Sequence, residues 1–306
     1  MQFIKKVKLI PKRSVLISCT ATLGKVGINN IELTTNQQIK ALLLKKNVRP
    51  EYIAYLFRTG LINLYDLSNN SGVKHINITT LSNIEIPVPP IEVQEKIIFE
   101  CEKLENKYET TRMKIEDYKL QIQKIFENLD VIKSDGGGYK LSDYNVFNLS
   151  IGNRVLQSDL VEKGIPVYSA NVNEAMGNIN KYLINDFNKP YIIWGIDGDW
   201  MVNLMPKGFE FYPTDHCGFM TVDENKINPR YMSYILEKEG KSIGFSRSFR
   251  ASLDRIKSIK INVPNIEIQN KEVNKVIELE QKINELRENQ IDLNKEISKV
   301  LNSYLN

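Results

Sequence analysis

The chain has 306 residues, of which 42% are hydrophobic and 25% are charged, and its formal net charge is +4. This length is about twice a typical domain of ~150 residues, the composition excludes a wholly disordered chain, and no apolar run approaches the ~20 residues of a membrane-spanning helix. Three scattered cysteines favour a reducing cytoplasm over a disulfide framework, and two histidines, His75 and His216, are too few for a site of three histidine ligands.

Positive charge is concentrated in two stretches. Residues 1–90 hold 12 Lys or Arg against 4 Asp or Glu, and residues 241–260 hold six bases against one acid, Asp254. Basic patches on otherwise balanced modules favour a polyanionic partner such as nucleic acid. A solvated, lysine-rich surface is the alternative interpretation.

Three segments of the chain recur in the same order, which indicates two copies of one structural unit. The matching pairs are 47–56 with 227–235, 81–94 with 256–269, and Thr35 with Thr214. Aligned on these matches, Met1 falls opposite Asn180, so the first copy is expected to be truncated at its N-terminus. We expect the apolar surface left open in that copy to be covered by another subunit or by self-association.

Each copy ends in a short strand, a proline and a long helix. In the first copy Ile84, Ile86 and Val88 alternate as in a strand, prolines follow, and a helix is predicted over 91–133. The second copy repeats the pattern, with a helix over 267–306. Apolar residues in both helices alternate at spacings of four and three, the pattern of a coiled-coil seam rather than of a single buried helix.

We expect the two helices to pair antiparallel, with Ile115 near Gln290, Leu104 near Leu301 and Ile125 near Leu279. The predicted helix–helix interface comprises Leu104, Ile115, Tyr118, Ile122, Ile125, Leu279, Leu286, Gln290 and Leu301.

A glycine-rich linker, Ser134–Gly138, separates the first helix from a complete globular module. Strands are predicted over 165–172, 191–196, 209–212 and 218–222, and a helix over 229–239. The predicted fold is α+β, with two globular mixed α/β domains joined by two long helices in an antiparallel coiled coil. The predicted boundaries are 1–90, 91–133, 134–266 and 267–306.

No catalytic motif is present in the sequence. Val88-Pro-Pro-Ile91 lacks the polar and aromatic residues of an amino-methyltransferase motif, and no Gly-x-x-x-x-Gly-Lys-Ser/Thr loop occurs. Glu239-Gly-Lys241 has the spacing of a nuclease pair but lacks a Pro-Asp partner on a strand. Asp197, Asp199 and Asp215 are ordinary acidic turn residues, and His216 and Cys217 would point to opposite faces of a strand. We therefore predict neither a metal site nor a cofactor.

The loop Gly244–Ser252 combines two arginines, hydroxyl groups and aromatic rings. Arginine can hold phosphate or pair with guanine through two hydrogen bonds, so the loop is a candidate DNA contact. The corresponding segment of the first copy, 69–77, is also polar and basic. In the alternative interpretation, the arginines pair with Glu237 or Glu239.

The repeated strand, Ile-Pro-x-Pro-Pro-x-x-x-Gln and long helix resemble the specificity subunit of type I restriction-modification systems. The segments 165–172, 214–218 and 245–252 are similar to parts of that family's target recognition domains. The resemblance implies that each recognition domain reads one half of a bipartite site in double-stranded DNA, and that the helices dock methyltransferase subunits. It also implies that catalysis belongs to those partners, and that a restriction subunit joins through the complex.

The candidate DNA-binding residues are Lys25, Lys74, His75, Asn77, Tyr168, Asn171, His216, Arg247, Ser248, Arg250 and Arg255. Two other functions remain open at this point. The chain could be the recognition portion of a single-chain methyltransferase-endonuclease, which an upstream Asn-Pro-Pro-Tyr on the same polypeptide would favour. It could also be a coiled-coil interaction protein without DNA binding, which undetectable or salt-insensitive duplex binding would favour.

Overall fold

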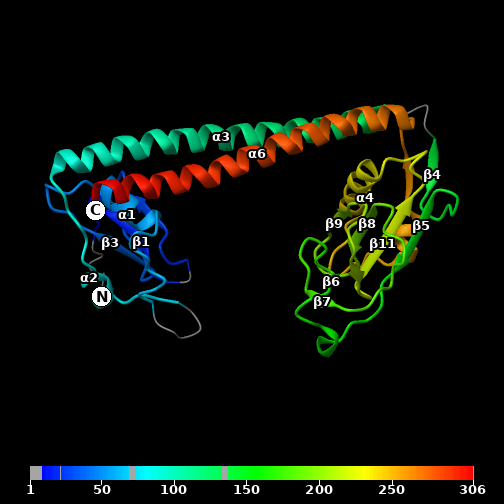
Figure 1. The fold of residues 1–306 in the computed structure, drawn as a ribbon, viewed down its shortest axis with the longest axis horizontal. Coiled ribbons are helices and arrows are strands. Elements are labelled where there is room, and N and C mark those ends of the chain that lie inside the picture. Colours follow the sequence, from blue (N-terminus) through cyan, green and yellow to red (C-terminus); the bar gives the residue numbers. More distant parts are fainter. Residues whose placement is uncertain (1–8, 21, 69–73, 133–136, 306) are drawn as a thin grey trace, which may run out of the picture. The chain divides into compact units, whose positions relative to one another are not determined.

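The computed structural model describes residues 9–20, 22–68, 74–132 and 137–305 (Figure 1). The chain divides into two compact units: a first unit of Met1–Glu116 with Ile283–Asn306, and a second unit of Asp117–Lys282. Two long helices, α3 (Ile91–Val131) and α6 (Ile266–Leu305), each contribute one end to each unit. In the described ranges, no helix is long and apolar enough to cross a membrane.

The first unit is a small antiparallel sheet covered by helices. Its strands are β1 (Val15–Ser18), β2 (Val26–Ile28) and β3 (Ile39–Leu42), in the order β2-β1-β3, and its short helices are α1 (Pro50–Arg58) and α2 (Ile78–Ser82). The β-branched residues Val15 and Ile17 alternate into the core, as a half-buried strand requires. There they meet Leu56 of α1, Ile97 of α3 and Leu301 of α6, so the unit is closed by the ends of both long helices.

The second unit has three sheets. Its strands are β4 (Gly138–Lys140), β5 (Phe147–Ile151), β6 (Ile165–Tyr168), β7 (Gly177–Ile179), β8 (Tyr191–Gly195), β9 (Val202–Met205), β10 (Tyr212–Pro213), β11 (Cys217–Val222) and β12 (Lys260–Asn262). Its helices are α4 (Pro229–Ile243) and α5 (Leu253–Ser258), with a 3₁₀ turn η1 (Gln157–Asp159). The sheet orders are β5-β11-β8-β9, β10-β6-β7 and β12-β4, and among the strand pairs of the described residues only β6–β10 is parallel.

The two units repeat one topology. The order β2-β1-β3 matches β9-β8-β11, with every pair antiparallel, and the helix after the third strand begins at a proline, Pro50 in one copy and Pro229 in the other. In the second unit β5 lies outside β11. Beside β3, no strand of the described residues takes that place. The internal repeat predicted from the sequence is therefore present at the level of strand order.

The predicted strand at Ile84–Val88 is wrong, because these residues are not hydrogen-bonded in a sheet. Its counterpart in the second unit, β12, is a strand because it pairs with β4 through Ile261 and Tyr139. The part of the first unit that the structure describes supplies no such partner. Alternating apolar residues without a neighbouring strand remain extended but do not form a ladder.

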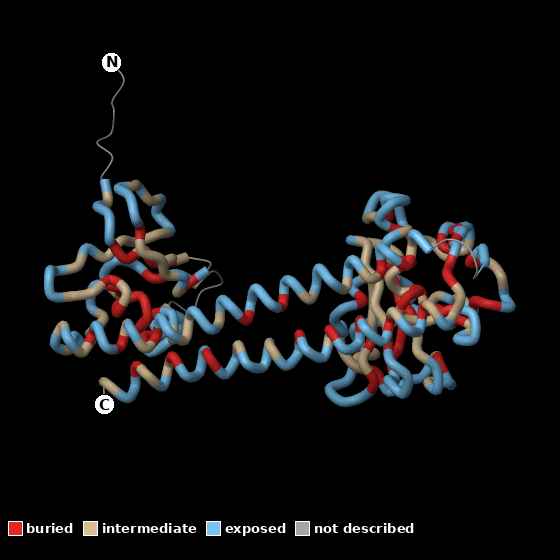
Figure 2. The backbone as a smooth tube through the Cα atoms, turned by 90° about the horizontal axis from the view of Figure 1, so that it is seen from above, coloured by how far each residue is buried: buried red, intermediate tan, exposed pale blue. Residues whose placement is uncertain are grey.

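Both long helices carry buried residues at regular intervals (Figure 2), and the predicted seam residues are all buried or half-buried. In the first unit, the Tyr304 hydroxyl donates to Glu100 Oε1 at 2.7 Å, and Gln290 Nε2 donates to the Tyr108 carbonyl at 3.5 Å. In the second unit, the Lys282 ammonium lies 5.9 Å from the Tyr118 ring centre. The first-unit contacts show that the helices run antiparallel there, and Leu104 and Leu301 lie in one hydrophobic cluster, as the predicted pairing requires. Gln290, predicted to lie near Ile115, reaches the carbonyl of Tyr108 with its side chain.

The predicted linker falls mostly outside the described residues, which resume at Gly137, and Gly138 opens β4. The predicted strands at 191–196 and 218–222 correspond to β8 and β11. Of the predicted strand at 209–212, only Tyr212 lies in a strand, the two-residue β10.

Candidate nucleic-acid interface

Four connections of the second unit meet where strands β6 and β8 end and β11 begins. The amide of Thr214 donates to the Tyr168 carbonyl at 2.9 Å, which ties the segment before β11 to the end of β6. The amide of Ile196 donates to the His216 carbonyl at 3.0 Å, and the amide of Ala251 donates to the Ile196 carbonyl at 2.9 Å. Main-chain hydrogen bonds thus assemble one surface from residues distant in sequence.

Close packing at Gly195 brings the segment after β6 onto this surface. A Cβ atom at Gly195 would lie 2.3 Å from the Ala170 carbonyl oxygen, a distance that real Cβ atoms do not show. The end of β8 can therefore approach the segment after β6 only because residue 195 has no side chain.

Asp197 links two of the candidate DNA-binding residues. Its carboxylate accepts a hydrogen bond from Arg250 Nη2 at 2.6 Å and lies 2.9 Å from His216 Nδ1. The Asp197 side chain is 19% exposed, whereas those of Arg250 and His216 are 60% and 48% exposed. A shielded carboxylate thus holds two outward-facing cationic or hydrogen-bonding groups side by side. From the sequence, Asp197 was expected to be an ordinary turn residue.

Within the described residues, the loop arginines do not pair with Glu237 or Glu239, as the alternative interpretation expected. Glu237 accepts a hydrogen bond from Lys241 Nζ at 2.5 Å, and Arg250 pairs with Asp197 instead. Arg247 is exposed and, among the described residues, makes no hydrogen bond or ion pair. Ser248 Oγ lies 3.2 Å from Ser246 Oγ at the tip of the loop. Arg247 therefore has its full set of donors available.

Aromatic stacking holds this loop in shape. α4 ends at Gly244, whose φ of +85° suits a residue without a Cβ. Phe245 packs on Trp200 at 5.1 Å and on Phe249 at 5.8 Å between ring centres. The Arg255 guanidinium lies 4.1 Å above the Phe249 ring.

Arg255 also donates from Nη1 to the Arg250 carbonyl at 2.6 Å. Arg255 therefore stabilises the loop, because its guanidinium group contacts both the Phe249 ring and the Arg250 carbonyl.

Two other predicted contacts have structural roles. Tyr168 is half-buried and packs edge-on against Phe211, and burial raises the pKa of its hydroxyl. Asn171 is exposed, but its Oδ1 accepts from the Asn173 amide at 3.0 Å and closes a turn. Beside His216, Cys217 is fully buried, and burial raises the pKa of its thiol, so the two residues do not form a thiolate–imidazole pair.

The predicted contacts of the first unit gather near the end of β1. The Lys25 carbonyl accepts from the Ser18 amide, and His75 forms a bridge with Thr20, while Lys74 beside it is half-buried. The neighbouring segment 69–73 lies outside the described residues.

Asn77 belongs to the same predicted set, and it caps α2. Its Oδ1 accepts from the Thr80 amide at 2.8 Å. Capping accounts for Asn77 without a DNA contact.

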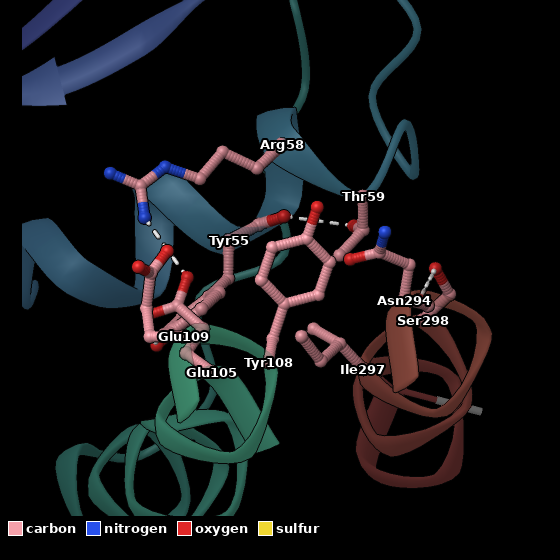
Figure 3. Close-up of a pocket in the computed structure, with 9 residues that line it drawn as sticks. All are labelled: Tyr55, Arg58, Thr59, Glu105, Tyr108, Glu109, Asn294, Ile297 and Ser298. Carbon is pink, nitrogen blue, oxygen red and sulfur yellow. Dashed lines mark hydrogen bonds and ion pairs between the residues drawn. The ribbon is translucent and has the colours of Figure 1, made fainter. Parts of the chain in front are cut away.

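A polar cleft of about 590 Å³ lies between α1, α3 and α6 in the first unit (Figure 3). On its walls the Tyr55 hydroxyl donates to Glu105 at 2.8 Å, and Arg58 pairs with the same carboxylate at 3.1 Å. Burial, reinforced by Glu105, raises the pKa of the Tyr55 hydroxyl. The charged groups of the cleft are thus already paired, and the contacts of Tyr55 and Arg58 with Glu105 anchor α1 on α3. No cluster of three or more potential metal ligands occurs within the described ranges.

The sequence matches the family described as the type I restriction modification DNA specificity domain over residues 2–117 and 139–294. The chain belongs to this family. It is a type I specificity subunit, from a family that recognises DNA sequence, and its two matched segments correspond to the two copies of the repeat.

Curated relatives support this assignment. The MjaIX specificity subunit of Methanocaldococcus jannaschii is 37% identical over 93 residues, covering 30% of this chain and 22% of that subunit. The HindI specificity subunit of Haemophilus influenzae is 32% identical over 114 residues, covering 35% and 25%. These matches thus span about a quarter of the relatives' length. A putative specificity subunit of Mycoplasma pneumoniae is 24% identical over 217 residues, covering 68% and 86%.

Solved structures show the same fold. A type I S subunit from M. genitalium aligns with a TM-score of 0.55 at 16% identity, over 98% of this chain and 84% of that one. A chain from a study of complex assembly and conformational transition of the type I system gives 0.57 at 15% identity, over 99% and 84%. The predicted fold class of this specificity subunit, with two mixed α/β recognition domains and paired long helices, is confirmed.

Proposed function

We propose that this specificity subunit reads a bipartite site in double-stranded DNA, one half with each recognition domain. In this proposal it carries no catalytic centre, docks methyltransferase subunits in the cytoplasm, and joins a restriction subunit through the assembled complex. The recognition domains are residues 1–90 and 134–266, and the spacer helices are residues 91–133 and 267–306. The supporting observation is the surface of the second unit that Arg247 and Arg250 of the loop after α4 share with His216, which lies just before β11.

The chemistry of that surface suits DNA. Exposed guanidinium groups bind phosphate oxygens or the O6 and N7 atoms of guanine, and hydroxyl groups add hydrogen bonds to the backbone. The Asp197 carboxylate is mostly shielded, whereas the Arg250 guanidinium that pairs with it is exposed and can donate outward. The first unit offers Lys25, Lys74 and His75 near the end of its equivalent strand.

The outer face of α3 supports docking of a protein partner. Phe99 and Met113 lie two heptads apart, opposite the buried seam, and are 69% and 71% exposed. Large apolar side chains so exposed on one helix face are typical of an interaction surface. We assign this face to the methyltransferase subunits.

The edge of the first-unit sheet favours a further contact. Within the described residues β3 pairs only with β1, whereas its counterpart β11 is hydrogen-bonded on both sides. Open strand edges recruit other strands. We therefore propose that this edge is covered in the complex, by another subunit or by a second copy of the chain.

The proposal is tested by binding of the chain, assembled with its cognate methyltransferase subunits, to a library of random-sequence duplexes at several salt concentrations. We expect selection of one bipartite sequence and a fall of log K with log salt. Undetectable or salt-insensitive binding would contradict the proposal and favour a coiled-coil interaction protein. For docking, Met113→Glu should prevent co-elution of the methyltransferase, and Lys299→Glu, exposed on the other long helix α6, should not.

A further inference from the structure

A second cleft, of about 390 Å³, adjoins the Asp197 surface in the second unit. Arg154 lies on its wall, as do Ser169, Thr214, Asp215 and His216. Arg154 is not among the DNA contacts predicted from the sequence, and Asp215 was expected to be an ordinary turn residue.

Main-chain contacts hold Arg154 next to the segment that carries Asp215. The Gly152 amide donates to the Cys217 carbonyl at 3.1 Å, and the Asn153 amide donates to the Pro213 carbonyl at 3.3 Å. A Cβ atom on Gly152 would lie 2.0 Å from the Pro213 oxygen, so this approach requires glycine. The two segments therefore run in contact immediately before Arg154 and immediately around Asp215.

The cleft presents a strong donor and a strong acceptor that do not satisfy each other. Arg154 is exposed and, within the described ranges, forms no hydrogen bond or ion pair. The Asp215 side chain is 43% exposed, and its nearest charged partner, His216 Nε2, lies 3.9 Å away, beyond hydrogen-bond distance. The bond from His216 Nδ1 to Asp197 fixes that ring and keeps it from turning onto Asp215.

This arrangement disfavours a phosphate and suits a base edge. A carboxylate in the cleft would repel a phosphate group, and Asp197 stands behind the adjoining wall. A neutral ligand with acceptors on one side and a donor on the other would satisfy both Arg154 and Asp215. In the major groove, guanine offers its O6 and N7 acceptors, and the paired cytosine offers its N4 amino donor.

We propose that Arg154 and Asp215 together read one G·C base pair of the half-site bound by the second unit. Arg154 donates two hydrogen bonds to guanine O6 and N7, and Asp215 accepts one from cytosine N4. The inference rests on the proposed DNA-recognition function and assigns two residues that determine specificity.

The test compares Arg154→Ala, Asp215→Ala and wild-type chains, each assembled with the methyltransferase subunits and selected on the random duplex library. Both variants should lose preference at the same single G·C position, by roughly 5- to 150-fold, and keep the other positions. Arg154→Lys keeps the charge but not the two-pronged geometry, so it should weaken guanine preference at that position and leave the salt slope unchanged. The control is Lys189→Ala, which removes the same charge from an exposed residue just before the start of β8. It should leave the base preference unchanged at every position of the site.

Three outcomes would overturn the proposal. Arg154→Ala could lower affinity equally for all sequences and reduce the salt slope, which would make Arg154 a phosphate contact. The two variants could affect different positions or an A·T pair. Preferences could also stay unchanged, which would place the cleft outside the interface. If the wild-type complex selects no sequence at all, the DNA-recognition function itself fails, so the two failures are distinguishable.

Discussion

Gln94 and Gln269 occupy the same position in the two copies of the repeat and hold the same set of main-chain groups. Gln94 Oε1 accepts from the Arg49 amide at 2.9 Å, while its Nε2 donates to the carbonyls of Asn47 at 3.0 Å and Pro89 at 2.8 Å. Both glutamine side chains are fully buried. Each side chain therefore fastens the start of a long helix to the loop before α1 or α4.

The second copy repeats this contact bond for bond. Gln269 Oε1 accepts from the Asn228 amide at 2.9 Å, and its Nε2 donates to Lys226 at 3.1 Å and Pro264 at 2.7 Å. The Pro-x-x-x-x-Gln pattern that marks the repeat in the sequence thus has a structural role: in each copy its glutamine hydrogen-bonds the start of the long helix to the loop before α1 or α4.

Gln94→Ala should lower the free energy of unfolding by about 1–3 kcal/mol, because it removes a fully buried side chain and leaves one partly buried amide and two partly buried carbonyls without partners. Urea denaturation of the purified chain measures this. Gln123→Ala, whose amide meets only the exposed Glu127, should change stability by less than about 0.5 kcal/mol. Equally small changes in the unfolding free energy for the two substitutions would show that the hydrogen bonds of Gln94 contribute nothing to stability.

The alkaline stability of the first unit should depend on Cys101. Burial, reinforced by Glu105, raises the pKa of this thiol from 9.0 to about 12. Between about pH 9 and 12 the unfolded chain loses this proton and the folded chain keeps it, so stability falls as pH rises. Cys101→Ala should show a shallower fall of unfolding free energy over this range. Identical slopes for variant and wild type would contradict the assignment.

The long helices could be predicted from the sequence because a 3.5-residue period is a local signal that holds over many turns. The observed helices, Ile91–Val131 and Ile266–Leu305, begin and end within two residues of the prediction. The seam midpoints also predicted the pairing of Leu104 with Leu301, which lie in one hydrophobic cluster. They did not predict the hydrogen bond from Gln290 to Tyr108, because the reach of a polar side chain is not recorded in the apolar pattern.

The candidate DNA interface could also be predicted only in part from the sequence. The basic loop with Arg247 and Arg250 stands out by composition, but its partner Asp197 is 53 residues away and looks like a turn residue. Tyr168 and Asn77 seemed polar and available, yet packing and helix capping account for them. Tertiary packing, which the sequence does not show, engages Tyr168, whereas the Asn77 cap is a local contact three residues long that an N-cap signal could have indicated.

Gly195→Ala should disturb the interface through the backbone. The added methyl would meet the Ala170 carbonyl, so the end of β8 and the segment after β6 must separate. We expect a loss of about 1–3 kcal/mol in stability, with weaker DNA binding. Gly27→Ala, which has open space around it, should be nearly neutral in both thermal unfolding and duplex binding. Unchanged binding by a folded Gly195→Ala chain would argue against the assembled surface.

Replacing Arg247 by alanine and replacing Arg250 by alanine should affect DNA binding differently. Arg247→Ala should lower the slope of log K against log salt by about 0.9, as expected for one lost phosphate contact. Arg250→Ala also uncovers the Asp197 carboxylate, which adds repulsion of about 1 kcal/mol from a nearby phosphate, so it should weaken binding more. Adding Asp197→Asn to Arg250→Ala should recover part of that loss. Binding and salt slope unchanged in both single variants would remove the loop from the interface.

The most direct measurement is a map of methylated sites in cells that express this subunit together with its cognate methyltransferase. The account predicts methylation at one bipartite sequence, with two specific parts separated by a non-specific spacer. It also predicts that changing Arg154 alters only the part read by the second unit. Methylation at the same sequence without the subunit, or at no defined sequence with it, would contradict its role as the DNA-reading component.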